Sequence, residues 1–210
     1  MKQAFLYLFC TLFICISASA QEVLYPVRGN TSGLETMHVE VDPNQRDRSR
    51  FVAEKTFEYK LVVEYPTKDE AGFLPNSEAR VTMFWLRVEN TAKRPLQVNT
   101  SGFSLTDEEG HSFPLLSPEE AFNRIMSSTL GRRTFLSNTK KAMGRSVVTE
   151  DELKDETVRF SFQSGAIDAL GLKQGLIFFE VPNRKKFTVT LRLGELWSRP
   201  FTFTNVKPKN

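Results

Sequence analysis

The stretch FEYKLVVEY, residues 57–65, decides the fold class, because its apolar side chains fall at every second position. Charged Glu58, Lys60 and Glu64 stand between them. Successive side chains of an extended strand point to opposite faces, so the pattern predicts a strand with one buried and one wet face. Pro66 is expected to end it.

Further extended stretches lie on both sides of this strand. RVTMFWLRV, residues 80–88, is apolar at both odd and even positions, which is typical of a central strand covered on both faces. Shorter strands are expected at 23–25, 37–41, 96–98, 103–105, 111–113, 158–162, 176–181, 187–193 and 201–203. At least seven alternating strands separated by turn signals predict an all-β, antiparallel sandwich.

One segment breaks the strand pattern. Ser117-Pro118-Glu119-Glu120 places a capping serine before a proline and a glutamate, which predicts the start of a helix that Gly131 ends. The apolar residues of this segment recur at helical spacing and are expected to pack against the sandwich: Phe122, Ile125, Met126 and Leu130. A second short helix is expected to begin at Thr149, so residues 117–156 form a helical insertion.

The first 20 residues have the pattern of a secretory signal. Lys2 precedes an apolar run that is too short to span a bilayer, and small residues 17–20 close it. Cleavage after Ala20 removes Cys10 and Cys15, the chain's two cysteines. We therefore expect an exported domain, periplasmic or extracellular, with no membrane span, disulfide, thiol nucleophile or thiolate metal site.

Composition and charge limit the remaining possibilities. Without Lys2 the chain carries 27 basic and 25 acidic residues, a balance that argues against nucleic acid as a partner. We expect a poorly assigned N-terminal segment at 21–50, with a polar loop over its last part, 42–50. The sandwich is expected to occupy 51–206 and a tail 207–210.

The helical insertion contains six basic residues that form a candidate binding face: Arg124, Arg132, Arg133, Lys140, Lys141 and Arg145. One interpretation is a surface for an anionic partner, such as a lipid headgroup, an acidic polysaccharide or an acidic protein. The interpretation that we favour is a solvated face, neutralised by the acidic residues within 150–156.

Histidines and carboxylates form catalytic and metal sites in many proteins. In this sequence they lack the neighbouring motif residues that catalysis or metal binding needs. No HxH, HExxH or GxSxG motif surrounds His38 or His111. The acidic run 107–109 leads into Gly110 and is typical of a turn, since it lacks the alternating oxygen ligands of a calcium loop. Trp197 is a candidate for an exposed sugar- or protein-binding surface. We expect no catalytic residue, metal site or cofactor.

The order of several short motifs resembles a known family. VENT (88–91), RPLQV (94–98), FSLTD (103–107) and FFEVP (178–182), with Gly110, Gly171 and Gly175, resemble the telokin-like, immunoglobulin-like extracellular domain of unknown function found in bacterial secreted proteins and lipoproteins. The resemblance implies an immunoglobulin-like sandwich exported across the bacterial inner membrane, without a known enzymatic site. The insertion at 117–156 and the region before Phe51 depart from the family.

The expected function is a secreted or periplasmic, non-catalytic binding or interaction module. Its partner would be an envelope protein, a glycan or an anionic surface. One alternative is a periplasmic assembly protein that lends a strand to a client, which requires a long unpaired edge strand. A second alternative is a hydrolase, which requires carboxylates gathered around His38 or His111.

Overall fold

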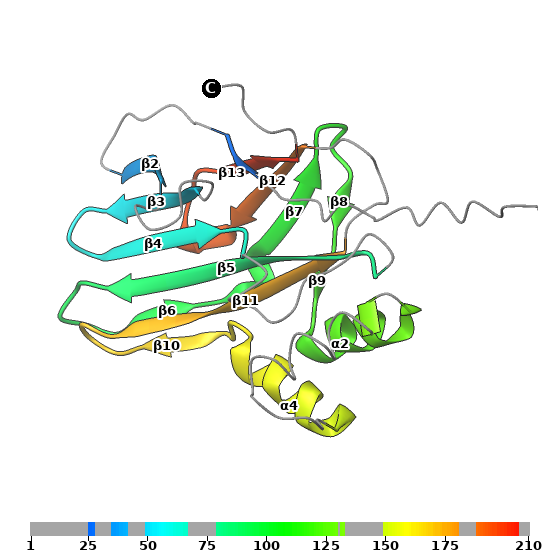
Figure 1. The fold of residues 1–210 in the computed structure, drawn as a ribbon. Coiled ribbons are helices and arrows are strands. Elements are labelled where there is room, and N and C mark those ends of the chain that lie inside the picture. Colours follow the sequence, from blue (N-terminus) through cyan, green and yellow to red (C-terminus); the bar gives the residue numbers. More distant parts are fainter. Residues whose placement is uncertain are drawn as a thin grey trace, which may run out of the picture.

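The computed structural model describes residues 25–27, 35–41, 49–66, 79–129, 131–132, 149–180 and 188–205. These residues form mostly antiparallel strands, with two α-helices at one side (Figure 1). The expected signal sequence and the C-terminal tail lie outside the described residues. The all-β prediction is confirmed for the part of the chain that the structure describes.

The larger sheet has six strands in the order β2-β3-β4-β5-β11-β9. Their bounds are Glu35–Val41 (β2), Ser49–Lys55 (β3), Tyr59–Glu64 (β4), Val81–Asn90 (β5), Leu172–Glu180 (β11) and Leu115–Leu116 (β9). Every neighbouring pair in this sheet is antiparallel.

The second sheet has five strands in the order β1-β13-β12-β7-β8, all antiparallel. Their bounds are Tyr25–Pro26 (β1), Phe201–Thr204 (β13), Thr188–Leu193 (β12), Phe103–Asp107 (β7) and Ser112–Phe113 (β8). Strands β6 (Leu96–Val98) and β10 (Gly165–Ile167) pair separately, and two short 3-10 helices complete the fold, η1 (Thr100–Gly102) and η2 (Gly194–Leu196).

The main core lies between the two sheets and is rich in phenylalanine. Phe51 of β3 and Phe84 of β5 meet Phe203 of β13, with ring centroids 5.2 and 4.8 Å apart. All three rings are buried, and each contributes about 1.5–3 kcal/mol of transfer free energy. Apolar burial of this kind holds the sheets together.

The helices α2 (Pro118–Ser127) and α4 (Glu150–Phe160) build a second core on the outer face of the larger sheet. Phe122 and Ile125 of α2 are buried in one cluster with Met83 and Phe178 of the sheet. The predicted packing of these two helical residues is confirmed. Both helices begin with a capping box, formed by Ser117 with Glu120 and by Thr149 with Glu152.

Gly175 of β11 makes room for the segment that follows α4, which passes close to the backbone of β11 at this point. Phe162 donates its backbone N–H to the carbonyl of Leu176, 2.8 Å away, so the two segments run in contact. A Cβ added at Gly175 would lie 2.6 Å from the backbone nitrogen of Phe162. A side chain at this position would push the segments apart.

Several expected boundaries are wrong. The strand expected at 158–162 is not formed: residues 158–160 are the end of α4, which continues to Phe160, and Ser161 forms an isolated bridge to Leu176. Helix α2 ends at Ser127, before the expected Gly131. The loop expected over 42–50 includes two residues that belong to β3, which begins at Ser49. Phe57 lies in a turn outside β4, although its spacing predicts a strand.

Candidate binding surface at one end of the larger sheet

Three connections meet at the end of the larger sheet that lies at the left of Figure 1. They are the β3–β4 turn (56–58), the link after β5 (91–95) and the β10–β11 turn (168–171). The carbonyl of Glu58 accepts the backbone N–H groups of Thr91 and Ala92, at 2.9 and 3.1 Å. The carbonyl of Ala92 in turn accepts the N–H of Leu170 at 3.1 Å. We call these three connections the turn cluster.

Asn90, the last residue of β5, braces the turn cluster from inside. Its side chain is buried and its amide nitrogen donates to the carbonyls of Arg94, Ile167 and Asp168, at 2.8, 3.2 and 2.9 Å. Its amide oxygen accepts the N–H of Ala92 at 3.0 Å. One asparagine therefore ties together backbone groups of two connections and the carbonyl of Ile167 at the end of β10.

Two large apolar side chains project from the turn cluster into solvent. Phe57 is 89% exposed and Leu170 is 70% exposed, and Leu172 beside the second turn is 50% exposed. Phe57 and Leu170 also have left-handed backbone conformations, with φ of 60° and 59°. Such a conformation costs a non-glycine residue on the order of 1 kcal/mol. The fold therefore holds two exposed apolar residues in strained turns.

Tyr59 anchors the β3–β4 turn to the second sheet. Its buried hydroxyl donates a hydrogen bond to the carbonyl of Leu196 in η2. Burial raises the pKa of Tyr59 far above its ordinary value, and the nearby carboxylates of Glu35 and Glu58 raise it further. Tyr59 therefore stays protonated and keeps its donor. The turn that carries Phe57 is thus fixed to both layers of the sandwich.

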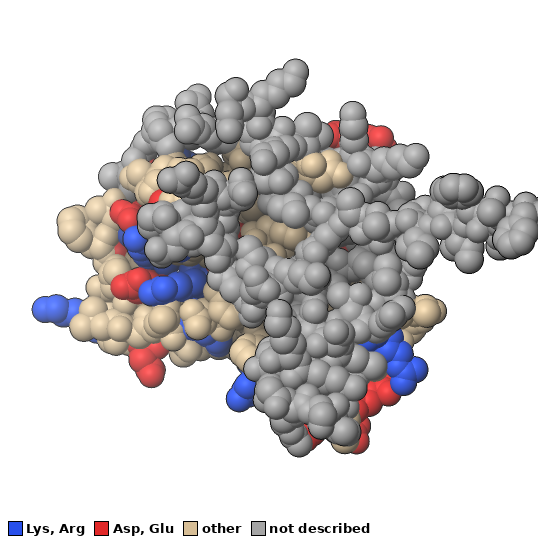
Figure 2. Space-filling view, viewed as in Figure 1, with Lys and Arg blue, Asp and Glu red and all other residues tan. Residues whose placement is uncertain are grey.

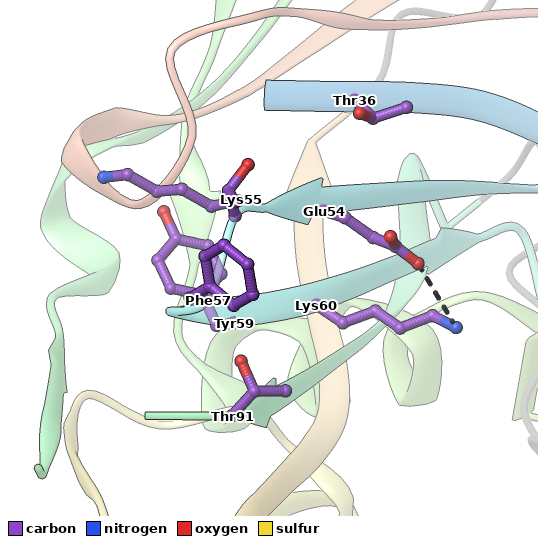
Figure 3. Close-up of a pocket in the computed structure, with 8 residues that line it drawn as sticks. Thr36, Glu54, Lys55, Phe57, Tyr59, Lys60 and Thr91 are labelled. Carbon is purple, nitrogen blue, oxygen red and sulfur yellow. Dashed lines mark ion pairs between the residues drawn. The ribbon is translucent and has the colours of Figure 1, made fainter. Parts of the chain in front are cut away.

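A cavity of about 450 Å³ opens beside the β3–β4 turn (Figure 3). Figure 3 shows the ring of Phe57 beside Lys55 and Tyr59, with Thr36 and Thr91 on opposite sides of the turn. The Glu54 and Lys60 side chains form an ion pair at 3.6 Å along the wall of this cavity. The cavity thus combines one exposed aromatic ring with hydroxyl and charged groups.

Charges around the turn cluster are mostly basic. Residues 55–58, 91–95 and 168–173 contain four basic side chains and two acidic ones. Glu58, one of the two acids, is engaged by Lys55 at 3.3 Å and by Arg94 at 3.1 Å. Figure 2 shows uncharged surface at the left end of the molecule with basic and acidic side chains beside it, and one basic side chain projects farthest to the left.

The structure describes two of the six residues of the expected basic face, and both are in ion pairs. Arg124 of α2 lies 3.0 Å from Glu180 at the end of β11. Arg132 lies 3.7 Å from Glu150 at the start of α4. The remaining four, Arg133, Lys140, Lys141 and Arg145, lie outside the described residues.

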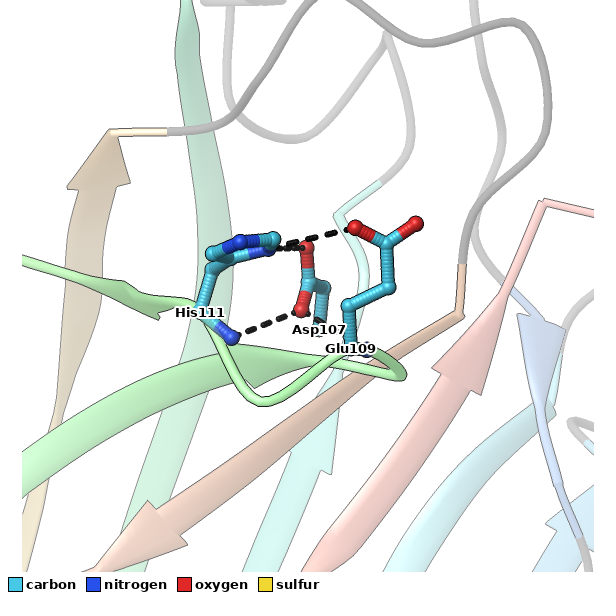
Figure 4. Close-up of side chains that lie close together, drawn as sticks. All are labelled: Asp107, Glu109 and His111. Carbon is cyan, nitrogen blue, oxygen red and sulfur yellow. Dashed lines mark hydrogen bonds and ion pairs between the residues drawn. The ribbon is translucent and has the colours of Figure 1, made fainter.

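The β7–β8 turn brings together Asp107, Glu109 and His111 (Figure 4). Oδ1 of Asp107 accepts the backbone N–H groups of Glu109 and His111, at 2.9 and 2.8 Å. Oδ2 of Asp107 and Nδ1 of His111 form a hydrogen bond of 2.9 Å. Desolvation raises the pKa of Asp107, but the bonds from His111 and Glu109 outweigh it and lower the pKa below its ordinary value. These contacts brace the turn.

The other residues singled out in the sequence lie apart from the turn cluster. His38 is exposed on β2, in a different sheet from the strands that flank His111. Trp197 is 1% exposed and stacks on Phe201, so the expectation of an exposed tryptophan is wrong. A second cavity of about 440 Å³ lies beside Ser117 and Glu120, whose polar groups bond to each other in the capping box.

Comparison with known proteins assigns no family. No family model matches the chain, and no curated protein matches it. The crystal structure of ycdA, a candidate lipoprotein from Bacillus subtilis, is similar over 70% of this chain and 36% of its own, with 14% sequence identity and a TM-score of 0.35. The chain thus spans little more than a third of that protein, and so distant a likeness supports no functional conclusion.

Within the described residues, none of the helices has the length and apolar character needed to cross a membrane.

Proposed function

We propose that this chain is an exported, non-catalytic binding module, built on an immunoglobulin-like sandwich, and that the turn cluster is its interaction surface. The observation that carries the proposal is the pair of solvent-exposed apolar residues in strained turns, Phe57 and Leu170. Strained backbone and exposed apolar groups both cost free energy in the unbound protein. Strained backbone of this kind clusters at functional sites and ligand-binding positions.

The free energy that binding could gain by burying these side chains favours this interpretation. Burying a phenylalanine or leucine side chain contributes about 1.5–3 kcal/mol, which exceeds the strain of its turn. The turn cluster is also held in place before binding, by Asn90 and by the Tyr59 hydroxyl. A surface that is already ordered does not pay the entropy of ordering when it binds.

The resemblance to immunoglobulin-like extracellular domains agrees with this placement. Two antiparallel sheets enclose the core, and the turn cluster lies at one end of the sandwich. Loops at the end of a sandwich carry the binding residues of many immunoglobulin-like domains, because the sheets provide a rigid base. The signal pattern at residues 1–20 supports a periplasmic or extracellular location.

The test measures binding by the exported form to three kinds of probe: lipid vesicles, a glycan array and proteins of an envelope extract. The test variant is the double substitution Phe57→Ser with Leu170→Ser, and the matched control is Val41→Ser, another exposed apolar residue. We expect the double variant to lose at least one interaction that the control keeps. Equal binding of both variants to every probe would contradict the proposal.

One observation favours a second candidate, the strand-lending assembly protein. Strand β2 is a proline-free edge strand of seven residues, and no strand among the described residues pairs with its outer edge. Such an edge offers free backbone donors and acceptors to a client strand. Proline substitutions at His38 and Val39, two neighbours with opposite N–H directions, test this role. An outward-facing proline is expected to abolish client capture without unfolding the protein.

A further inference from the structure

We infer that the partner of the turn cluster is the surface of an anionic lipid bilayer, into which Phe57 and Leu170 insert. The inference rests on the proposed function and names the class of partner. Three properties of the turn cluster carry it: the shape of its apolar tips, the surrounding charge and the rigidity of the turns.

The two apolar tips, the side chains of Phe57 and Leu170, are separate from each other and protrude from the protein surface. Phe57 precedes β4 and Leu170 precedes β11, and these strands lie on opposite sides of β5, so the tips stand about 10 Å apart. Exposures of 89% and 70% show that neither side chain is packed into the core. A fluid bilayer accepts such tips at the boundary between headgroups and acyl chains. A folded protein would need two matching pockets at the same spacing.

The charge around the tips complements an anionic surface. Lys93 and Arg94 are exposed in the link between the two tips, and Lys173 follows Leu172. The carboxylate of Glu58 is held by Lys55 and Arg94, which reduces its repulsion of lipid phosphates. Asp168 is exposed and opposes binding, and the three connections themselves carry two basic and two acidic residues; the flanking Lys55 and Lys173 give this end of the sheet its excess of two basic residues. Basic residues next to a membrane surface strengthen binding to anionic lipids.

Backbone hydrogen bonds between the connections hold the two tips in a fixed position relative to each other. Leu170 donates to Ala92, and Ala92 donates to Glu58 next to Phe57, so the two tips belong to one bonded unit. Both side chains then reach the bilayer in a single orientation of the protein. The cavity beside Phe57 offers a sugar a different mode of binding, but that mode leaves the exposure of Leu170 without a role.

The test is co-sedimentation with vesicles of phosphatidylcholine alone or of an equal mixture with phosphatidylglycerol. The protein is the exported form, and mass spectrometry confirms that the apolar residues 1–20 are absent. We expect binding to the mixed vesicles. Phe57→Ser and Leu170→Ser are each expected to weaken it by about tenfold, because each removes one inserted side chain.

Charge and control variants sharpen the test. The double variant Lys93→Ala with Arg94→Ala is expected to weaken binding to mixed vesicles by about tenfold and to remove most of its salt dependence. Val41→Ser, on β2, is expected to bind as the unmodified protein does. Circular dichroism and denaturation of each variant verify that the fold is intact.

Two results would overturn the inference: no sedimentation with either vesicle, or sedimentation that Phe57→Ser and Leu170→Ser leave unchanged. If the two substitutions instead abolish capture of a glycan or an envelope protein, the bilayer is excluded and the proposed function stands. If they affect no probe at all, the proposed function fails as well.

Discussion

The β7–β8 turn and the β3–β4 turn solve the same problem with opposite residues. In the first, Gly110 takes the left-handed position with φ of 84°, and Asp107 satisfies the backbone donors of the turn. In the second, Phe57 takes the left-handed position and projects into solvent. The first turn is built for stability. The second accepts strain and apolar exposure, a cost to the fold that the proposed binding role of Phe57 would account for.

The largest expected effect concerns the support of the turn cluster. Asn90→Ala removes four hydrogen bonds at a buried position, so we expect the free energy of unfolding to fall by about 3 kcal/mol. Urea denaturation measures the change. Binding through the turn cluster is also expected to weaken, because the link and the β10–β11 turn lose their common anchor. A loss below about 1 kcal/mol would show that the brace is unimportant.

The β7–β8 turn is expected to respond to pH. The folded pKa of Asp107 lies below its unfolded value, so its contribution is present above the unfolded pKa of about 3.9 and is lost as the pH falls through the folded pKa. Asp107→Asn retains an oxygen for the two backbone donors but removes the charge. Acid titrations of stability should therefore be flatter for this variant than for the unmodified protein. Parallel curves below pH of about 4 would contradict this account.

The sequence predicted the two-layer β architecture well and the candidate site poorly, for a common reason. Burial repeats along a strand, so the alternation at 59–65 and the two-sided pattern at 80–88 report the core directly. Phe57 continues the same alternation by coincidence, because the chain reverses over residues 56–58 without a glycine or asparagine to mark the turn. The spacing of a residue does not tell whether its backbone is left-handed.

The sequence-based prediction for the helical region contains a related error. Val158 and Phe160 are two residues apart and follow the strand pattern, but both lie in α4. The capping box at Thr149 fixes where the helix begins, whereas no glycine or proline near 156 marks its end. Leu170 carried no recognisable signal, since its exposure depends on how the β10–β11 turn bonds to Ala92 across the sheet.

A smaller effect is expected at the glycine of the β7–β8 turn. A Cβ at Gly110 would meet no atom within 4 Å, so Gly110→Ala changes only the cost of the left-handed conformation. We expect a loss of about 1 kcal/mol in the free energy of unfolding. The measurement calibrates the strain of the left-handed position on this scaffold. An unchanged stability would remove the basis for calling the β3–β4 turn strained.

The smallest expected change in stability is an increase in the free energy of unfolding, and it is the most diagnostic one. Phe57→Asn keeps the left-handed backbone at lower cost, since asparagine tolerates φ near 60°, and the 89% exposed ring gives up little packing. We expect the free energy of unfolding to rise by about 0.5–1 kcal/mol while binding falls. Thermal and urea denaturation, read beside the vesicle assay, separate the two effects. A residue whose removal stabilises the fold and abolishes binding is retained for function, and a variant that loses stability as well would place Phe57 among the structural residues.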